Sequence, residues 1–432
     1  MNNRGFTLVE MMVAIAIFIV LLMITMETFT TILVQTSKLF KSEESNIEGV
    51  VGLEMFRHDL QQAGFGLPYS YDANTPIVYK EAGYAPANLF NDAPGGIPRA
   101  IVAGNNSGSA ADLNRDGGEN YTVLPNTDYL VIKATSVGAN NASQKWTYVT
   151  YSSSIRAPKK WPGENLKHKV DNIIVLRRTF KDSGYDNQLV YAPSKNPQGM
   201  YWVTYNDFGF STVYSPTQPA EKYYLYGINS SSDVGMPFNR VDYFVAKPLD
   251  TTKIPAKCSE NTGILYRAGV NHKSTEPGGK LKLTPSPILD CVADMQVVFG
   301  WNLADEGGTV LIDEENPGLN SAMLGNGAVD TWSNADGTQV SSSVAATTVQ
   351  VQAAMADPGH IRTKLKIVKV YILAQNGKKD LTYTSPASIP IGEPGEANLT
   401  KPAGFSITPS MQRFRWKIYR LIIKPDNLVS NQ

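Results

Sequence analysis

The N-terminal region decides the fold, because residues 6–26 read FTLVEMMVAIAIFIVLLMITM. Thr25 is the one polar residue between positions 11 and 26, and neither proline nor glycine occurs from Phe6 to Val34. As a helix, this stretch would extend about 43 Å, which exceeds the roughly 30 Å hydrocarbon core of a bilayer. The sequence therefore predicts a membrane-spanning helix.

Charges on either side of this stretch predict its orientation. Arg4 precedes it, and the next basic residue is Lys38, which favours a cytoplasmic N-terminus with the rest of the chain across the membrane. A secretory signal peptide has a shorter apolar run and then a small-residue cleavage site, and no Ala-x-Ala follows here. A plain anchor explains the length but not Glu10, since a carboxylate at mid-bilayer costs about 2.5–3.5 kcal/mol.

The segment Gly5-Phe6-Thr7-Leu8-Val9-Glu10 resembles the type III signal of the type IV pilin family, which includes minor pilins and type II secretion pseudopilins. The resemblance implies that prepilin peptidase cuts between Gly5 and Phe6 and that Phe6 becomes the N-methylated terminus. It also implies that Glu10 neutralises the terminal amine of a neighbouring subunit during assembly. Two interpretations stay open for Glu27, which either reaches the periplasmic headgroups or contacts a partner pilin.

The helix is predicted to continue beyond the membrane as an amphipathic half over residues 35–63. Gly64, Gly66 and Pro68 follow this half and end it. Its apolar residues recur at helical spacing, with charged residues between them: they are Leu39, Phe40, Ile47, Val50, Leu53, Phe56 and Leu60. One stripe of this half is therefore predicted to pack against a sheet.

The remainder predicts an α+β fold, in which the long N-terminal helix packs on a mostly antiparallel β-sheet domain with large loop insertions. Short β-branched and aromatic runs from Tyr129 onward predict the strands. The chain divides into a leader at 1–5, a transmembrane or filament-core helix half at 6–34, an amphipathic half at 35–63, a loop-rich connection at 64–128 and a β-rich globular domain at 129–432.

Several later segments resemble, in order, landmarks of PilW-like minor pilins and J-type pseudopilins: EMFRHDLQQAGFG, RVDYFVAK, GILYRAG, ILDCVADMQVVFGWN and KLKIVKVYILAQ. The chain is long for a J-type pseudopilin, which favours the pilus interpretation. Residues 134–240 and 302–360 resemble these groups least and are interpreted as insertions rich in Tyr, Ser, Asn and Gly.

Residues 112–117 read DLNRDG, which matches the first half of a calcium loop with Asp112, Asn114 and Asp116 as candidate ligands. The twelfth position of such a loop would be Val123 instead of Glu, so Glu119 or Asn120 would have to replace it. The alternative is a turn rich in Asn and Asp. Calcium at this loop is the one cofactor that the sequence suggests.

Cys258 and Cys291 lie on the far side of the membrane in this topology, where an oxidising periplasm permits a disulfide. The alternative is one buried and one exposed thiol.

With 39 basic and 39 acidic residues the formal charge is zero, which excludes a strongly basic nucleic-acid binder. No HExxH, Walker A, GxSxG or helix-opening GxGxxG motif occurs, and His168, His272 and His360 are predicted to be exposed in polar loops. We therefore expect a protein that is not an enzyme.

Three functions remain open. The favoured one is a tip or initiation minor pilin that primes type IV pilus assembly through its helix. Its expected partners are other minor and major pilins, prepilin peptidase and the inner-membrane assembly platform. It would reside in the bacterial inner membrane, with a periplasmic C-terminus, before assembly and in the extracellular pilus afterwards. The alternatives are a J-type secretion pseudopilin and an adhesive or binding module on a pilin anchor, which the Tyr-rich insertions suggest.

Overall fold

The computed structural model describes residues 8–71, 77–107, 121–153, 157–181, 184–191, 201–210, 212–230, 234–273, 279–316 and 318–429. The chain divides into two compact units, Met1–Val50 and Val51–Gln432, which we call the N-terminal unit and the head. The fold is α+β, as the sequence predicted, with an apolar N-terminal helix and mostly antiparallel sheets.

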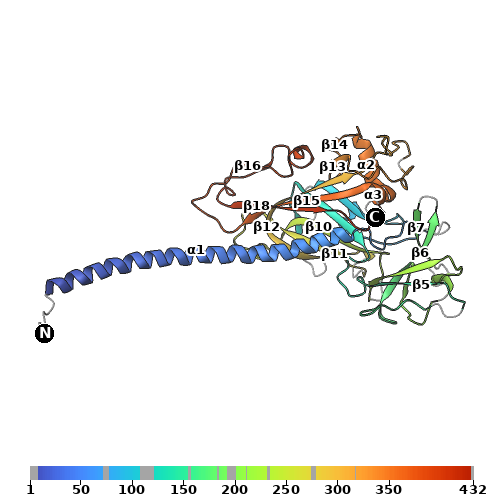
Figure 1. Ribbon diagram of the computed structural model, residues 1–432, viewed down its shortest axis with the longest axis horizontal. Helices are drawn as coiled ribbons and strands as arrows, with labels where there is room; N and C mark the ends of the chain where they lie inside the picture. The colour runs from blue at the N-terminus through green and yellow to red at the C-terminus, as the bar shows by residue number, and fades with distance from the viewer. Residues whose placement is uncertain are drawn as a thin grey trace. The chain divides into compact units, whose positions relative to one another are not determined.

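Helix α1 runs without interruption over Leu8–Gln62 (Figure 1). Its C-terminal end lies one residue before the predicted boundary. Gly64 and Gly66 then adopt left-handed backbone angles, with φ of 86° and 68°, a region that glycine enters without steric cost. The Gly64 amide leaves the helix direction and donates to the Lys133 carbonyl at 3.0 Å, so the chain turns directly onto the sheet.

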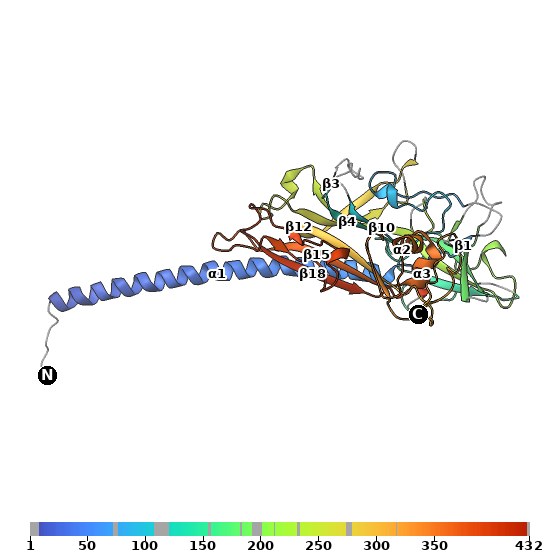
Figure 2. The same cartoon turned by 90° about the horizontal axis from the view of Figure 1, so that it is seen from above.

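The main sheet of the head has ten strands and carries the largest core (Figures 1 and 2). Its strands are β2 (Ile101–Ser107), β3 (Tyr121–Val123), β4 (Thr127–Ala134), β10 (Asn239–Pro248), β11 (Gly263–Val270), β12 (Leu283–Trp301), β13 (Thr331–Asn334), β14 (Val340–Ser342), β15 (Leu365–Asn376) and β18 (Arg415–Ile423). The main path through the sheet is β14-β13-β12-β11-β10-β4-β2. Strand β15 joins β12 to the edge strand β18, β3 pairs with β10, and all of these pairings are antiparallel.

A second sheet is built mostly from the predicted insertion 134–240. Its strands are β1 (Ser70–Tyr71), β5 (Trp146–Thr150), β6 (Asn172–Lys181), β7 (Gly184–Leu189), β8 (Trp202–Thr204) and β9 (Lys222–Asn229). Their order in the sheet is β1-β7-β6-β9-β5, and β8 pairs with β6. One face closes a separate small core that includes Val149, Val175 and Leu225. This part of the insertion is therefore a folded layer.

Short elements complete the head. Helix α2 (Thr348–Ala356) begins with a capping box between Thr347 and Gln350, and α3 (Pro358–Lys364) follows with Asp357 as its N-cap. The remaining elements are β16 (Ser388–Ile389), β17 (Phe405–Ser406) and the 3₁₀ turns η1 (Ala87–Phe90), η3 (Thr212–Tyr214), η4 (Thr251–Lys253) and η6 (Ala397–Leu399).

The last three turns of α1 belong to the head and pack into its core. Leu53, Phe56 and Leu60 are buried, and the ring of Phe56 stacks on Tyr243 with centroids 3.7 Å apart. Gly52 lies against the backbone of Ile288, where a Cβ atom would collide with the Ile288 carbonyl. A glycine is therefore needed for this close approach of helix and strand.

Asp59 joins this helix end to the sheet by polar contacts. Its Oδ2 accepts hydrogen bonds from Tyr243 Oη at 2.7 Å and from Arg267 Nε at 2.6 Å. The Asp59 side chain is almost fully buried. Burial alone would lower the pKa of Arg267, but the Asp59 carboxylate raises it, so the guanidinium stays charged. This buried pair holds the helix in register on β10 and β11.

We expect Asp59→Ala to destabilise the head by about 3–5 kcal/mol, because it leaves the Arg267 charge buried without its partner. Glu54→Ala is the matched control on the same helix, since Glu54 pairs with Arg57 at the surface, where such pairs contribute at most about 1 kcal/mol. Chemical denaturation of both variants measures the difference. Equal stabilities would contradict the anchoring role of Asp59.

Candidate functional site

The part of α1 from Leu8 to Thr30 is long and apolar enough to cross a membrane, and none of it is buried. Large apolar side chains are exposed around the helix, for example Phe18, Leu22 and Phe29. Apolar surface on this scale is stable in water only when lipid or protein covers it. The segment therefore requires a bilayer or other helices around it.

The polar side chains of this segment are of two kinds. The hydroxyls of Thr25, Thr28 and Thr30 donate to carbonyls three or four residues earlier, at 2.8–3.0 Å, so their donors are satisfied within the helix. Glu10 and Glu27 are its two charged residues. Glu10 lies exposed in the first turn, where the positive end of the helix dipole favours a carboxylate.

Gly5 and Phe6, the predicted cleavage pair, precede the described residues. Asp112, Asn114 and Asp116 likewise lie outside the described part of the chain, so calcium binding stays a prediction. Among the described residues, no group of three or more His, Cys, Asp or Glu side chains is arranged to hold a metal ion.

The histidine prediction is wrong for His360, which is fully buried. His272 is partly buried, and desolvation lowers its pKa to about 4. His272 Nε2 lies 2.8 Å from Asn239 Oδ1 in a structural contact. A polar local sequence does not reveal burial, because the covering residues come from distant segments. His168 is partly exposed beside Asp207.

A buried ionic cluster holds the segment 77–100 on the sheet. Lys133 Nζ lies 2.7 Å from Glu81 and 2.6 Å from Asp92, and Arg240 bridges Glu81 and Asp242. Burial opposes the charge on Glu81, but Lys133 and Arg240 hold its pKa below the ordinary value. Because every member has an opposite-charge partner, the cluster is structural.

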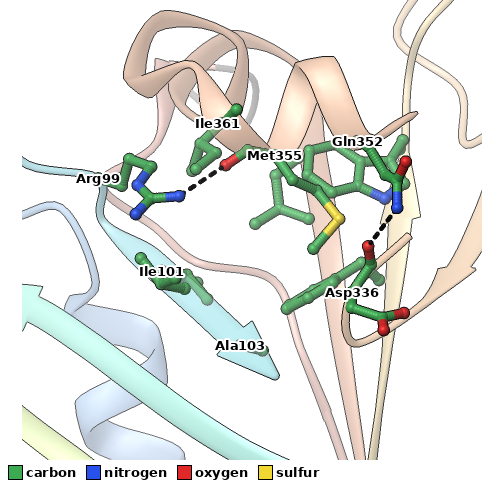
Figure 3. A pocket seen from close by; sticks show the side chains of 12 residues that line it. Arg99, Ile101, Ala103, Asp336, Gln352, Met355 and Ile361 are labelled. Carbon is green, nitrogen blue, oxygen red and sulfur yellow. Dashed lines mark hydrogen bonds between the residues drawn. The ribbon is translucent and has the colours of Figure 1, made fainter. Parts of the chain in front are cut away.

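The cavity in Figure 3 lies between β2 and helices α2 and α3, and its volume is about 260 Å³. Its polar lining groups are engaged with backbone carbonyls: Arg99 donates to Met355 at 3.4 Å, and Gln352 donates to Asp336 at 3.4 Å. Arg99 is also paired with Asp92 at 2.6 Å. Within the described part of the chain, the twelve residues that line this cavity include no Ser, Thr, Cys or His.

Cys258 and Cys291 form a disulfide, with Cα atoms 4.9 Å apart. Gly263 of β11 pairs with Val292 of β12, so the bond closes the base of the β11–β12 hairpin. The bond leaves neither of these cysteines as a free thiol.

We expect the double variant Cys258→Ser, Cys291→Ser to lose about 3–4 kcal/mol of stability, the chain-entropy value for a loop of this size. Thermal unfolding with and without reductant provides the measurement. The wild type should lose stability in reductant, whereas the variant should not respond. A wild type unaffected by reductant would contradict the bond.

Comparison with known proteins gives one match. A family model described as the prokaryotic N-terminal methylation motif matches residues 1–26. Neither the curated proteins nor the solved structures yield a significant match. The chain thus carries the type IV pilin-like signal that prepilin peptidase processes, followed by an apolar helix that fits a single-pass membrane protein.

Proposed function

We propose that this protein is a minor pilin that acts at the tip of a type IV pilus and primes its assembly. The observation that carries the proposal is the fully exposed apolar helix Leu8–Thr30 behind a methylation motif. Such a helix has two environments in this system, the membrane before assembly and the bundle of other pilin helices afterwards. Moving from the first to the second keeps its apolar surface out of water.

The size of the head supports a tip position. The unit Val51–Gln432 contains a ten-stranded and a six-stranded sheet, so repeated copies would compete for space along a shaft. At a tip, a head would not compete for space with repeated copies of itself. There the protein would lower the barrier to starting a filament by providing the first helices for incoming subunits. We infer no catalytic activity and no cofactor requirement.

The proposed partners follow from this role. They are the other minor and major pilins through helix packing, prepilin peptidase at the N-terminus, and the assembly platform of the inner membrane. The head would then be periplasmic before assembly and extracellular afterwards.

Labelling tests the position directly. An epitope inserted after Lys378, in the exposed turn that follows β15, should be found by immunogold microscopy at filament ends. Deletion of the protein should strongly reduce the number of surface filaments. Label distributed evenly along the shaft would contradict the tip role. Normal filaments with loss of protein secretion would favour the J-type pseudopilin alternative.

A further inference from the structure

The second sheet carries a row of cations and tyrosines on the face opposite its small core. Lys222 of β9 lies directly opposite Arg178 of β6, and Arg178 lies opposite Asn187 of β7. In the next row, Tyr148 of β5 lies opposite Tyr224 of β9. Directly opposed residues of antiparallel strands share a face, so these side chains form one continuous surface.

Each cation of this surface stands over an aromatic ring. Arg178 lies 4.4 Å from the Tyr224 centroid and 5.4 Å from that of Tyr185. Lys222 lies 4.1 Å from the Tyr148 centroid and 5.4 Å from that of Tyr224.

The row continues at β1, because the Tyr69 amide donates to the Asn187 carbonyl at 2.8 Å. Arg362 of α3 stands 3.9 Å from the Tyr69 centroid. We call this surface the cation strip and define it by three cations and four rings: Arg178, Lys222, Arg362, Tyr69, Tyr148, Tyr185 and Tyr224.

The cations of the strip differ from most buried cations of the head in their ion pairing. Within the described residues, no carboxylate forms an ion pair with Arg178, Lys222 or Arg362. Arg178 donates to the amide oxygen of Asn187 at 3.0 Å, and the negative charges of Asp186 and Asp357 act on Arg362. The buried cations Lys133, Arg240 and Lys369 have carboxylate partners, whereas the buried Lys364 donates to the Met323 carbonyl.

The tyrosine hydroxyls of the strip add hydrogen-bonding groups next to its cations. For Tyr148 and Tyr224, no hydrogen-bond partner of the hydroxyl occurs among the described residues, and both side chains are partly exposed. Tyr185 is 64% exposed. The strip therefore offers cationic donors beside hydroxyl groups, at the surface of the head.

We propose that the cation strip binds an acidic polysaccharide, a polymer of uronic acids. Its carboxylates would accept charge-assisted hydrogen bonds from the three cations, and its hydroxyl groups would bond to the phenols. A single-stranded nucleic acid fits less well, because its bases need open ring faces for stacking, and here cations lie over those faces.

The test uses the full-length protein in detergent micelles and polygalacturonate as the probe. Binding is measured by calorimetry, with neutral dextran and oligothymidylate as comparison polymers. The double variant Arg178→Gln, Lys222→Gln should weaken polygalacturonate binding at least about tenfold, the scale of one lost charged hydrogen bond. The variant Arg178→Lys, Lys222→Arg keeps the charges and should retain most of the binding.

The matched control is Lys378→Gln, Lys379→Gln, which removes two exposed charges from the turn after β15 and should leave affinity unchanged. Thermal unfolding verifies that each variant is folded; if the double variant is not, Lys222→Gln alone replaces it. The proposal is overturned by absence of polygalacturonate binding, by equal losses in the control, or by tighter binding of oligothymidylate through the same two residues. None of these measurements depends on cleavage or filament assembly, so this inference and the proposed function fail separately.

Discussion

Replacing Glu10 by alanine is expected to leave the protein processed and inserted in the membrane but to reduce its incorporation into filaments about a hundredfold. Cleavage after Gly5 would create a positive amine at Phe6, four residues from Glu10. In an apolar helix bundle that charge is costly alone, and a neighbouring carboxylate offsets the cost. Without Glu10 the incoming amine has no partner, so docking fails although the helix is intact.

Glu27→Ala provides the matched control, because it removes the same charge from the same exposed helix segment. If Glu27 reaches the headgroups, its loss should change incorporation by less than about threefold. Immunoblots of sheared filaments against membrane fractions measure both variants. Equal incorporation of Glu10→Ala and wild type would contradict the pairing, and an equal loss in both variants would contradict a role specific to Glu10.

Gly5→Val should block removal of the leader. A protease must approach the backbone closely at the bond it cuts, and a branched side chain beside that bond obstructs the approach. Misplacement by about 1 Å can slow catalysis about a hundredfold, so uncut precursor should accumulate. Mass spectrometry of membrane protein would detect residues 1–5 still attached. Asn3→Ala, which changes the leader away from the bond, should be processed normally, and complete cleavage of Gly5→Val would contradict the assigned site.

The long helix and the α+β class were predictable because their causes are local. An unbroken apolar run, an amphipathic continuation and a Gly-x-Gly-x-Pro end at residues 64–68 are all visible in the sequence. The structure has this helix as α1 and a largely antiparallel head. Val241–Ala246 and Ile264–Tyr266 are two of the apolar and aromatic runs that predict strands, and they pair as β10 and β11.

Other features depend on contacts between distant segments and cannot be recognised from the local sequence. From the sequence, Gly52 only weakens a helix, whereas the structure places it against Ile288. Each face of β18 has residues in a core: Trp416 packs into a satellite core formed with residues 391–411, and Ile423 packs into the main core. The cation strip likewise needs the register of four strands, which no single segment encodes.

The proposed assembly requires that the chain is cut at its inner end and then packed by its apolar helix into a filament. Mass spectrometry of the N-terminal peptide from sheared filaments examines both steps at once. We expect a peptide that begins at Phe6 and carries one added methyl group on its amine. A peptide from those filaments that begins at Met1, or a filament fraction that lacks the protein, would contradict it.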